Sequence, residues 1–94
     1  MNKYESVIII TPNIDDDKRK EVITKVETLI NNNGKVTNVE EKGKKKLAYE
    51  IQKCKEAYYV IFYFEAESTF IAELERNFRI TDEIIKFMTV REED

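Results

Sequence analysis

This 94-residue chain contains one short basic segment, Gly43-Lys44-Lys45-Lys46, whose residue types are suited to binding phosphate groups. Lysine presents a flexible point charge, and the phosphate backbone of a nucleic acid attracts such charges. Leu47, Tyr49 and Ile51 follow at alternate positions, which predicts a half-buried strand, and Gly43 predicts a bend or bulge where the lysines begin. We therefore expect a positively charged arm that runs into a hydrophobic strand.

Enzymatic chemistry has few candidate residues in this sequence. The chain has no histidine, so the commonest general base near neutral pH is absent, and one cysteine without histidine cannot form a zinc site. Cys54 lies between Lys53 and Lys55, yet without a histidine base we expect a turn cysteine and not a nucleophile. No Gly-rich phosphate loop is present. We expect no enzyme activity, no metal and no cofactor.

Size and charge limit the classes of protein that the chain could represent. With 94 residues we expect a single domain, residues 1–94, whose last few residues form a short acidic tail. No apolar run approaches the ~20 residues that cross a bilayer, and neither a secretory signal nor a disulfide pair is present, so we expect a cytoplasmic protein without a membrane partner. The net charge of −3 argues against a simple nucleic-acid binder, although the lysines are segregated around residues 42–55.

The hydrophobic periodicity predicts four strands and two helices. We expect strands at 4–10, 36–51, 57–65 and 84–91, and helices at 16–32 and from about Ser68 to Phe78. Asp15 to Asp17 suit a helix N-terminus, Gly34 suits the residue after a helix, and Ser68 suits a cap. Turns are expected at Lys53 to Glu56 and at Thr81-Asp82.

The order βαββαβ predicts a ferredoxin-like α+β sandwich. Two right-handed split β-α-β units form a four-stranded antiparallel sheet of order 4-1-3-2 with both helices on one face. This fold occurs in enzymes, metal carriers and RNA-binding proteins, and so it does not by itself indicate a function.

The sheet face away from the helices is predicted to be apolar. The residues expected to face the helices are Tyr4, Ser6, Ile8, Ile10, Tyr58, Val60, Phe62, Phe64, Ile85, Phe87 and Thr89. The residues then expected on the opposite face, besides Lys86, form a contiguous patch of Val7, Ile9, Tyr59, Ile61, Tyr63, Met88 and Val90. A patch of this kind on a small protein is typical of a partner-binding surface, unless a loop, a tail or a second copy of the chain covers it.

Two other functions on this fold fit the residues less well. An acylphosphatase-like enzyme needs a glycine-rich anion loop with an arginine after the first strand, where this chain has TPNIDDD. An RNA-recognition motif carries a basic residue, a glycine and aromatics on its third strand. The segment KEAYYVIF keeps Lys55, Tyr59 and Phe62 but lacks the glycine and the first aromatic. Base stacking on Tyr59 stays open, and we favour protein packing there.

Five segments resemble, in their order, the family of the sixth protein of the bacterial small ribosomal subunit. They are Lys3-Tyr4-Glu5, Pro12-Asn13-Ile14-Asp15, the segment EKGKKKLAYEI at 41–51, Phe78-Arg79-Ile80-Thr81-Asp82, and Met88-Thr89-Val90-Arg91. The resemblance covers nearly the whole chain and implies the same βαββαβ fold. It also implies a structural constituent of the small ribosomal subunit that binds the central domain of small-subunit ribosomal RNA together with the eighteenth small-subunit protein.

The resemblance further implies which residues contact RNA. The matching basic positions are Lys3, Arg79, Lys86 and Arg91, to which Lys44, Lys45 and Lys46 add, and Tyr4 is expected to pack inward rather than to stack on a base. Asn2 is neutral where relatives often carry a basic residue, and the acidic end after Arg91 is shorter than in many of them. We therefore expect weak RNA binding alone and tight binding in a heterodimer. The alternative is a homo-oligomeric interaction module that does not bind RNA.

Overall fold

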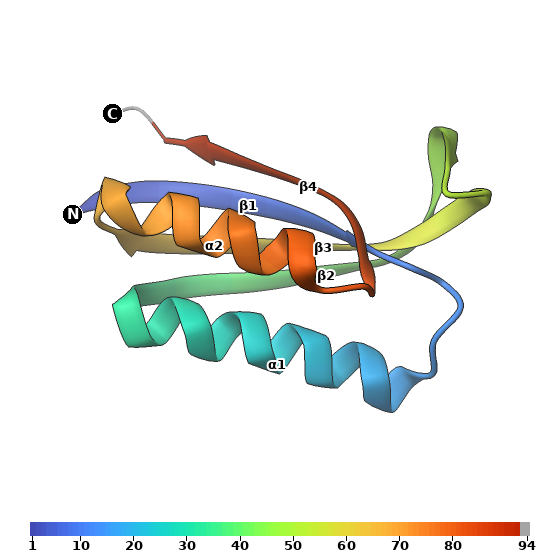
Figure 1. Ribbon diagram of the computed structural model, residues 1–94, viewed down its shortest axis with the longest axis horizontal. Coiled ribbons are helices and arrows are strands. Elements are labelled where there is room, and N and C mark those ends of the chain that lie inside the picture. The colour runs from blue at the N-terminus through green and yellow to red at the C-terminus, as the bar shows by residue number, and fades with distance from the viewer. Residues whose placement is uncertain (93–94) are drawn as a thin grey trace.

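The chain forms one antiparallel sheet with two helices packed against one of its faces, and the computed structural model describes residues 1–92 (Figure 1). The elements are β1 (Asn2–Ile10), α1 (Asp16–Asn33), β2 (Gly34–Ile51), β3 (Cys54–Ala66), α2 (Ser68–Ile80) and β4 (Ile84–Arg91). The sheet order β2-β3-β1-β4 is the predicted order 4-1-3-2 counted from the opposite edge, so the predicted fold is confirmed. The predicted acidic tail includes residues 93–94, which lie outside the described residues.

Helix α1 begins where its acidic residues predict. The Asp15 carboxylate accepts a hydrogen bond of 2.8 Å from the backbone N–H of Lys18, and thereby satisfies a donor that the helix itself leaves unpaired. Asp16 and Asp17 occupy the first turn, where negative charge stabilises the helix dipole. The buried stripe of the helix has the predicted spacing and consists of Val22, Ile23, Val26 and Ile30.

Helix α2 has the predicted apolar stripe but not the predicted cap. Phe70, Leu74 and Phe78 are buried against the sheet. The prediction that Ser68 caps this helix is wrong, because the helix begins at Ser68 and Glu67 is its N-cap residue, without a side-chain capping bond. The first turn closes through the backbone instead, since the Phe70 N–H donates to the Glu67 carbonyl oxygen at 3.0 Å.

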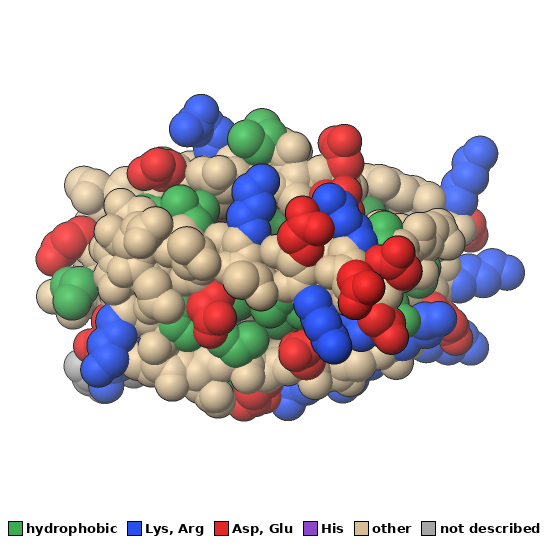
Figure 2. All heavy atoms as spheres, turned by 90° about the horizontal axis from the view of Figure 1, so that it is seen from below, with side chains coloured by type: hydrophobic (Ala, Val, Ile, Leu, Met, Phe, Trp, Pro, Cys, Tyr) green, Lys and Arg blue, Asp and Glu red, His purple; other side chains and the backbone are tan. Residues whose placement is uncertain are grey.

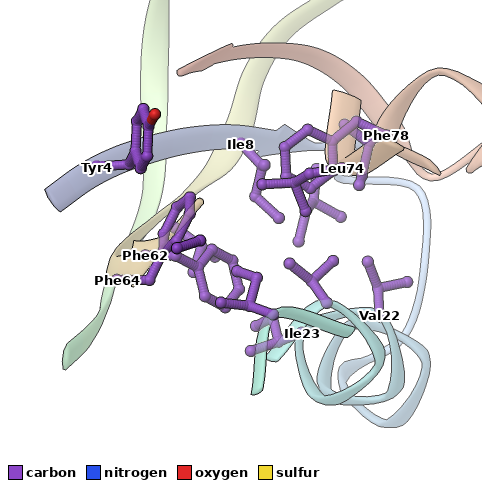
Figure 3. Packing of buried hydrophobic residues seen from close by; sticks show 14 of the residues in the cluster. Tyr4, Ile8, Val22, Ile23, Phe62, Phe64, Leu74 and Phe78 are labelled. Atoms are coloured by element: carbon purple, nitrogen blue, oxygen red, sulfur yellow. The ribbon is translucent and has the colours of Figure 1, made fainter. Parts of the chain in front are cut away.

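The core lies between the helices and the inner face of the sheet (Figure 3). Phe62 and Phe64 on β3 are fully buried, and Tyr4 on β1 stacks on Phe64 with ring centroids 5.6 Å apart. Ser6 is the one buried polar residue of the described chain, and its hydroxyl is 2.7 Å from that of Thr89. This hydrogen bond satisfies a polar group that would otherwise destabilise the core. The inward prediction for β1 and β3 is confirmed.

The face assignment in β4 is wrong at one residue. Ile84 lies in the main core, whereas Ile85, expected to face the helices, packs against the cluster on the other face. The cause is a shift of register: Ile9 lies opposite Lys86, but Ile10 lies opposite Ile84, so β4 contains one additional residue. Such a bulge reverses the alternation locally, and Phe87 and Thr89 keep their predicted side.

The pairing of β2 with β3 is irregular at three positions: between Val36 and Asn38, between Glu41 and Gly43, and between Lys46 and Ile51. The register shifts at Gly43, whose φ of +76° is the predicted bulge. Lys46 pairs with Glu56 and Ile51 pairs with Cys54, so that residues 47–50 lie opposite residue 55 alone and bend away from the ladder. The turn consists of residues 52 and 53, both with positive φ, and therefore lies earlier than the predicted turn at residues 53–56. Together these irregularities allow the hairpin to fold back over the sheet.

Gly34 is essential for a different reason from the one predicted. A glycine after a helix commonly adopts the left-handed conformation, but Gly34 has a φ of −172°, which is extended. A Cβ atom there would lie 2.2 Å from the Glu65 carbonyl oxygen on β3. Because backbone atoms cannot easily move aside, the close approach of β2 to β3 requires glycine at this position.

We predict that Gly34→Ala lowers the free energy of unfolding by about 1–3 kcal/mol, as overpacking does, and that Gly34→Asn lowers it no less. Gly43 provides the control, because a Cβ there meets no atom within 4 Å and only the positive φ opposes it. Asparagine tolerates that conformation, so Gly43→Asn should destabilise less than Gly43→Ala. Urea unfolding measures all four variants, and a Gly34→Ala protein as stable as the wild type would contradict the steric explanation.

Candidate protein and RNA interfaces

The sheet face opposite the helices, called the outer face below, is organised in rows that cross β3, β1 and β4. The strand register places Ile61, Val7 and Met88 side by side in a central row. Tyr63, Glu5 and Val90 form the row on one side of it; Tyr59, Ile9 and Lys86 form the row on the other side. All seven residues predicted for the partner face therefore share one side of the sheet.

The central row is the most apolar part of the outer face. Met88 is 59% exposed, while Val7 and Ile61 are half-buried by their neighbours, and Val90 in the adjacent row is 45% exposed. Cross-strand neighbours of this kind pack against each other, yet their outer surfaces stay in contact with water. A continuous apolar row without cover is typical of a surface that binds a partner.

The hairpin covers the end of the outer face at Ile9. This residue is only 8% exposed because it packs in a second cluster with Leu47, Cys54 and Ala57, and Tyr59 and Ile51 are partly buried against the cluster. The predicted partner face is therefore shorter than expected, since Ile9 is already covered by the chain itself. A covering loop, one of the alternatives left open by the sequence, accounts for this end of the sheet.

A contact between the hairpin and β4 holds this arrangement. The Lys86 ammonium donates a hydrogen bond to the Tyr49 hydroxyl and lies 4.9 Å from the centroid of the Tyr49 ring. Tyr49 is 60% exposed, and so it does not take the half-buried position that its alternation with Leu47 predicts. Sequence reasoning missed this pair, because the two residues are 37 positions apart and no local pattern links them.

Carboxylates surround Tyr63 at the other end of the outer face. Partial burial raises the pKa of the Tyr63 hydroxyl, and the nearby carboxylates of Glu40, Glu5 and Glu92 raise it further, whereas Lys42 lowers it. Glu40 forms an ion pair of 2.6 Å with Lys42. A hollow of about 390 Å³ adjoins Tyr63 and is also lined by Glu65. We call this region, with Glu5, Glu40, Glu65 and Glu92, the carboxylate end.

Four of the predicted RNA-binding residues do not form one patch. Lys3 lies on β1 at the carboxylate end, and Lys86 lies three rows away near the hairpin. Arg91 pairs with Tyr4, whose side chain faces the helices, and its guanidinium donates to the Asn2 side-chain oxygen at 2.9 Å. The neutral residue at position 2 thus orients a predicted RNA contact.

Arg79 lies on the helix side of the molecule, in the last turn of α2. Its guanidinium is 4.0 Å from the Glu75 carboxylate and 5.6 Å from the centroid of the Phe87 ring. An exposed ion pair of this kind contributes little to stability. The cationic group therefore stays available to an anion.

The three consecutive lysines of β2 diverge because strand side chains alternate. Lys44 pairs with Tyr58, which packs against the main core, and its ammonium lies 5.7 Å from the Tyr58 ring. Lys45 pairs with Ala57, a member of the cluster on the outer face. The basic run predicted as one arm is therefore divided between the two sides of the hairpin.

The remaining features give no support to catalysis. Cys54 is buried, and its thiol donates to the Gln52 carbonyl oxygen at 3.7 Å. Among residues 1–92 no group of three or more histidine, cysteine or acidic side chains is arranged to hold a metal ion. None of the helices in this part of the chain is long and apolar enough to cross a membrane.

Comparison with known proteins gives one consistent family. The family model described as Ribosomal protein S6 matches residues 3–91. Proteins named small ribosomal subunit protein bS6 are 42% identical over 91 residues in Alkaliphilus oremlandii, with 97% of each chain covered, and 42% identical over 93 residues in Gloeobacter violaceus, with 98% of this chain and 97% of that protein covered. The crystal structure of 30S ribosomal protein S6 from Thermotoga maritima superposes with a TM-score of 0.93 at 38% identity, covering 97% of this chain and 87% of that one.

The covered and uncovered ends of the outer face should respond differently to truncation. We predict that Ile9→Ala lowers the free energy of unfolding by about 2–4 kcal/mol, because it opens a cavity beneath the hairpin. Met88→Ala, on the same face but 59% exposed, should cost less than about 1 kcal/mol. Thermal and urea unfolding compare the two variants. Equal losses would show that the hairpin does not cover Ile9 in solution.

Proposed function

The chain belongs to the ribosomal protein S6 family, and from this premise we propose that it binds the central domain of small-subunit ribosomal RNA together with the eighteenth small-subunit protein. As a member of that family it is a structural constituent of the small subunit of the cytoplasmic ribosome and not an enzyme. The finer assignment, to that RNA region and that partner, rests on the surface of the sheet.

The observation that carries the proposal is the uncovered central row beside the carboxylate end. Val7, Ile61 and Met88 offer an apolar strip, and carboxylates adjoin it at Glu5 and Glu40. A partner that fits this surface presents apolar side chains to the strip and basic side chains to the carboxylates. Complementary charge of this kind gives orientation and fast association more than affinity, and the apolar contacts supply the affinity.

The charge of the chain explains why the partner is needed for RNA binding. The net charge is −3, and a protein gains affinity for RNA mainly by neutralising phosphates. The basic residues that we propose as RNA contacts are few and dispersed: Lys3, Lys44, Lys45, Lys46, Arg79, Lys86 and Arg91. A basic partner bound at the carboxylate end would neutralise the charge that opposes RNA and would add contacts of its own. Contacts from dispersed lysines and arginines fix position on the RNA rather than read its sequence.

The alternative function, a homo-oligomeric module that associates through the same sheet face, agrees less well with the charges on that face. Two copies paired through the central row would bring Glu5 and Glu40 of each chain close to the same carboxylates of the other. Like charges at an interface oppose association. Of the lysines at this end, Lys42 is paired with Glu40, and Lys3 lies opposite Glu65 in the strand register. The carboxylate end therefore favours a basic protein over a second copy.

We predict that the isolated protein binds a central-domain RNA fragment weakly and that the heterodimer binds it at least tenfold more tightly. Filter binding with and without the eighteenth protein measures this difference, which corresponds to about 1.4 kcal/mol or more. Equal affinity under both conditions would reject the heterodimer mechanism.

A pair of variants in the same system locates the interface. Met88→Glu introduces a charge into the central row and should weaken binding of the eighteenth protein at least tenfold by calorimetry. Ile80→Glu is the matched control, because Ile80 is an equally large hydrophobe, 68% exposed, at the end of α2. Loss of partner binding in the control but not in Met88→Glu would move the interface to the helix side.

A further inference from the structure

A second basic surface lies where the β2–β3 hairpin meets the loop between β1 and α1. A hollow of about 520 Å³ is lined there by Lys44, Lys46, Lys53, Lys55, Glu56 and Asn13. The hollow is shallow and open to solvent, a shape that an extended polyanion can reach. We call this site the lysine hollow.

The irregular hairpin brings these four lysines together. Lys44 and Lys46 share one side of β2 because their side chains alternate with that of Lys45. The two-residue turn ends at Lys53, with a φ of +65°, and Lys55 follows at the start of β3. Two strands and one turn thus direct four cationic groups to the same space, although the groups are up to eleven positions apart in the sequence.

The charge of the lysine hollow is not neutralised within the described chain. Four lysines face a single lining carboxylate, Glu56, and none of the four belongs to an ion pair among residues 1–92. The acidic start of α1 lies close by along the chain, but Asp15, Asp16 and Asp17 do not line the hollow; Asp15 caps the helix, and Asp16 pairs with Arg19 at 2.7 Å. All four lysines are exposed, so their ammonium groups are free to meet an anion.

The lysine hollow is far from Lys3 and Arg91, two of the other proposed RNA contacts. Lys3 and Arg91 lie at the beginning of β1 and the end of β4, whereas the hollow lies beyond the other end of β1. Seven residue steps along β1 separate Lys3 from Ile10 at the far end of the strand, which corresponds to about 24 Å at roughly 3.4 Å per residue. Figure 1 shows the hairpin at the opposite end of the molecule from both termini, and Figure 2 shows basic side chains projecting from that hairpin end, with acidic side chains gathered nearby on the helix side.

We propose that the lysine hollow binds successive phosphodiester groups of the ribosomal RNA, as a contact separate from the one at Lys3 and Arg91. The inference rests on the proposed RNA-binding function, which supplies the polyanion, and it adds Lys53 and Lys55 to the contact residues. Lysine suits this task because a flexible point charge adapts to the phosphate backbone. The two contacts together would fix the protein along the RNA over most of its length.

The test uses the heterodimer with the eighteenth protein and a central-domain RNA fragment. The variant Lys44→Gln/Lys46→Gln/Lys53→Gln/Lys55→Gln removes the four charges, and Lys20→Gln/Lys25→Gln/Lys35→Gln/Arg76→Gln removes four exposed charges that do not line the hollow. Each lost phosphate contact lowers the slope of log K against log salt by roughly 0.7–0.9. We expect the hollow variant, which loses four contacts, to reduce the magnitude of this slope by about 3, and the control to keep the wild-type slope. Circular dichroism verifies that both variants fold.

Four results would overturn the inference, and they differ in what they say about the proposed function. A wild-type slope in the hollow variant would show that the lysine hollow does not contact RNA, although the heterodimer still binds RNA. The same loss in both variants would show that only net charge matters. Binding of a polyglutamate peptide is measured in parallel. If the hollow variant binds RNA as the wild type does but no longer binds this peptide, the hollow is a site for an acidic protein segment. Absence of RNA binding by the wild-type heterodimer would reject the proposed function and this contact with it.

Discussion

Alternation of side chains across one four-stranded sheet determines both the core and the interface of this protein. Helices cover only one face of the sheet, so each apolar residue on the other face needs a second source of cover. The chain supplies that cover at one end, where the hairpin packs Leu47 over Ile9. It leaves the central row of Val7, Ile61 and Met88 in contact with water. The proposed binding of a protein partner rests on this incomplete cover.

Local patterns in the sequence were sufficient for most of the fold. Alternation in β1 and β3 predicts the inner and outer residues correctly, and the apolar spacing of α1 predicts its buried stripe. The errors occur where backbone geometry overrides a pattern. A bulge moves Ile85 to the outer face, and Glu67 replaces Ser68 as the cap. Gly34 is predicted only as the residue after a helix, whereas the structure requires glycine there because of its contact with Glu65 on β3, 31 residues away in the chain.

The candidate sites were less predictable than the fold, because they depend on contacts between distant residues. The sequence indicates a basic arm at Lys44 to Lys46, but strand alternation divides it, and the hollow also needs Lys53 and Lys55 from beyond the turn. Likewise, no pattern predicts that Tyr49 holds Lys86 or that the hairpin covers Ile9. The charges of the folded protein are therefore segregated by tertiary structure: carboxylates gather beside Tyr63 at one end, and lysines gather at the other.

We propose above all that the uncovered central row binds a different, basic protein and not a second copy of this chain. Sedimentation equilibrium of the isolated protein at low salt, over a wide range of concentration, tests it most directly. We predict the mass of a single chain throughout, because carboxylates next to the apolar row oppose self-association. A stable dimer that dissociates when Met88 is replaced by glutamate would show that the chain self-associates through the central row, and would contradict this proposal.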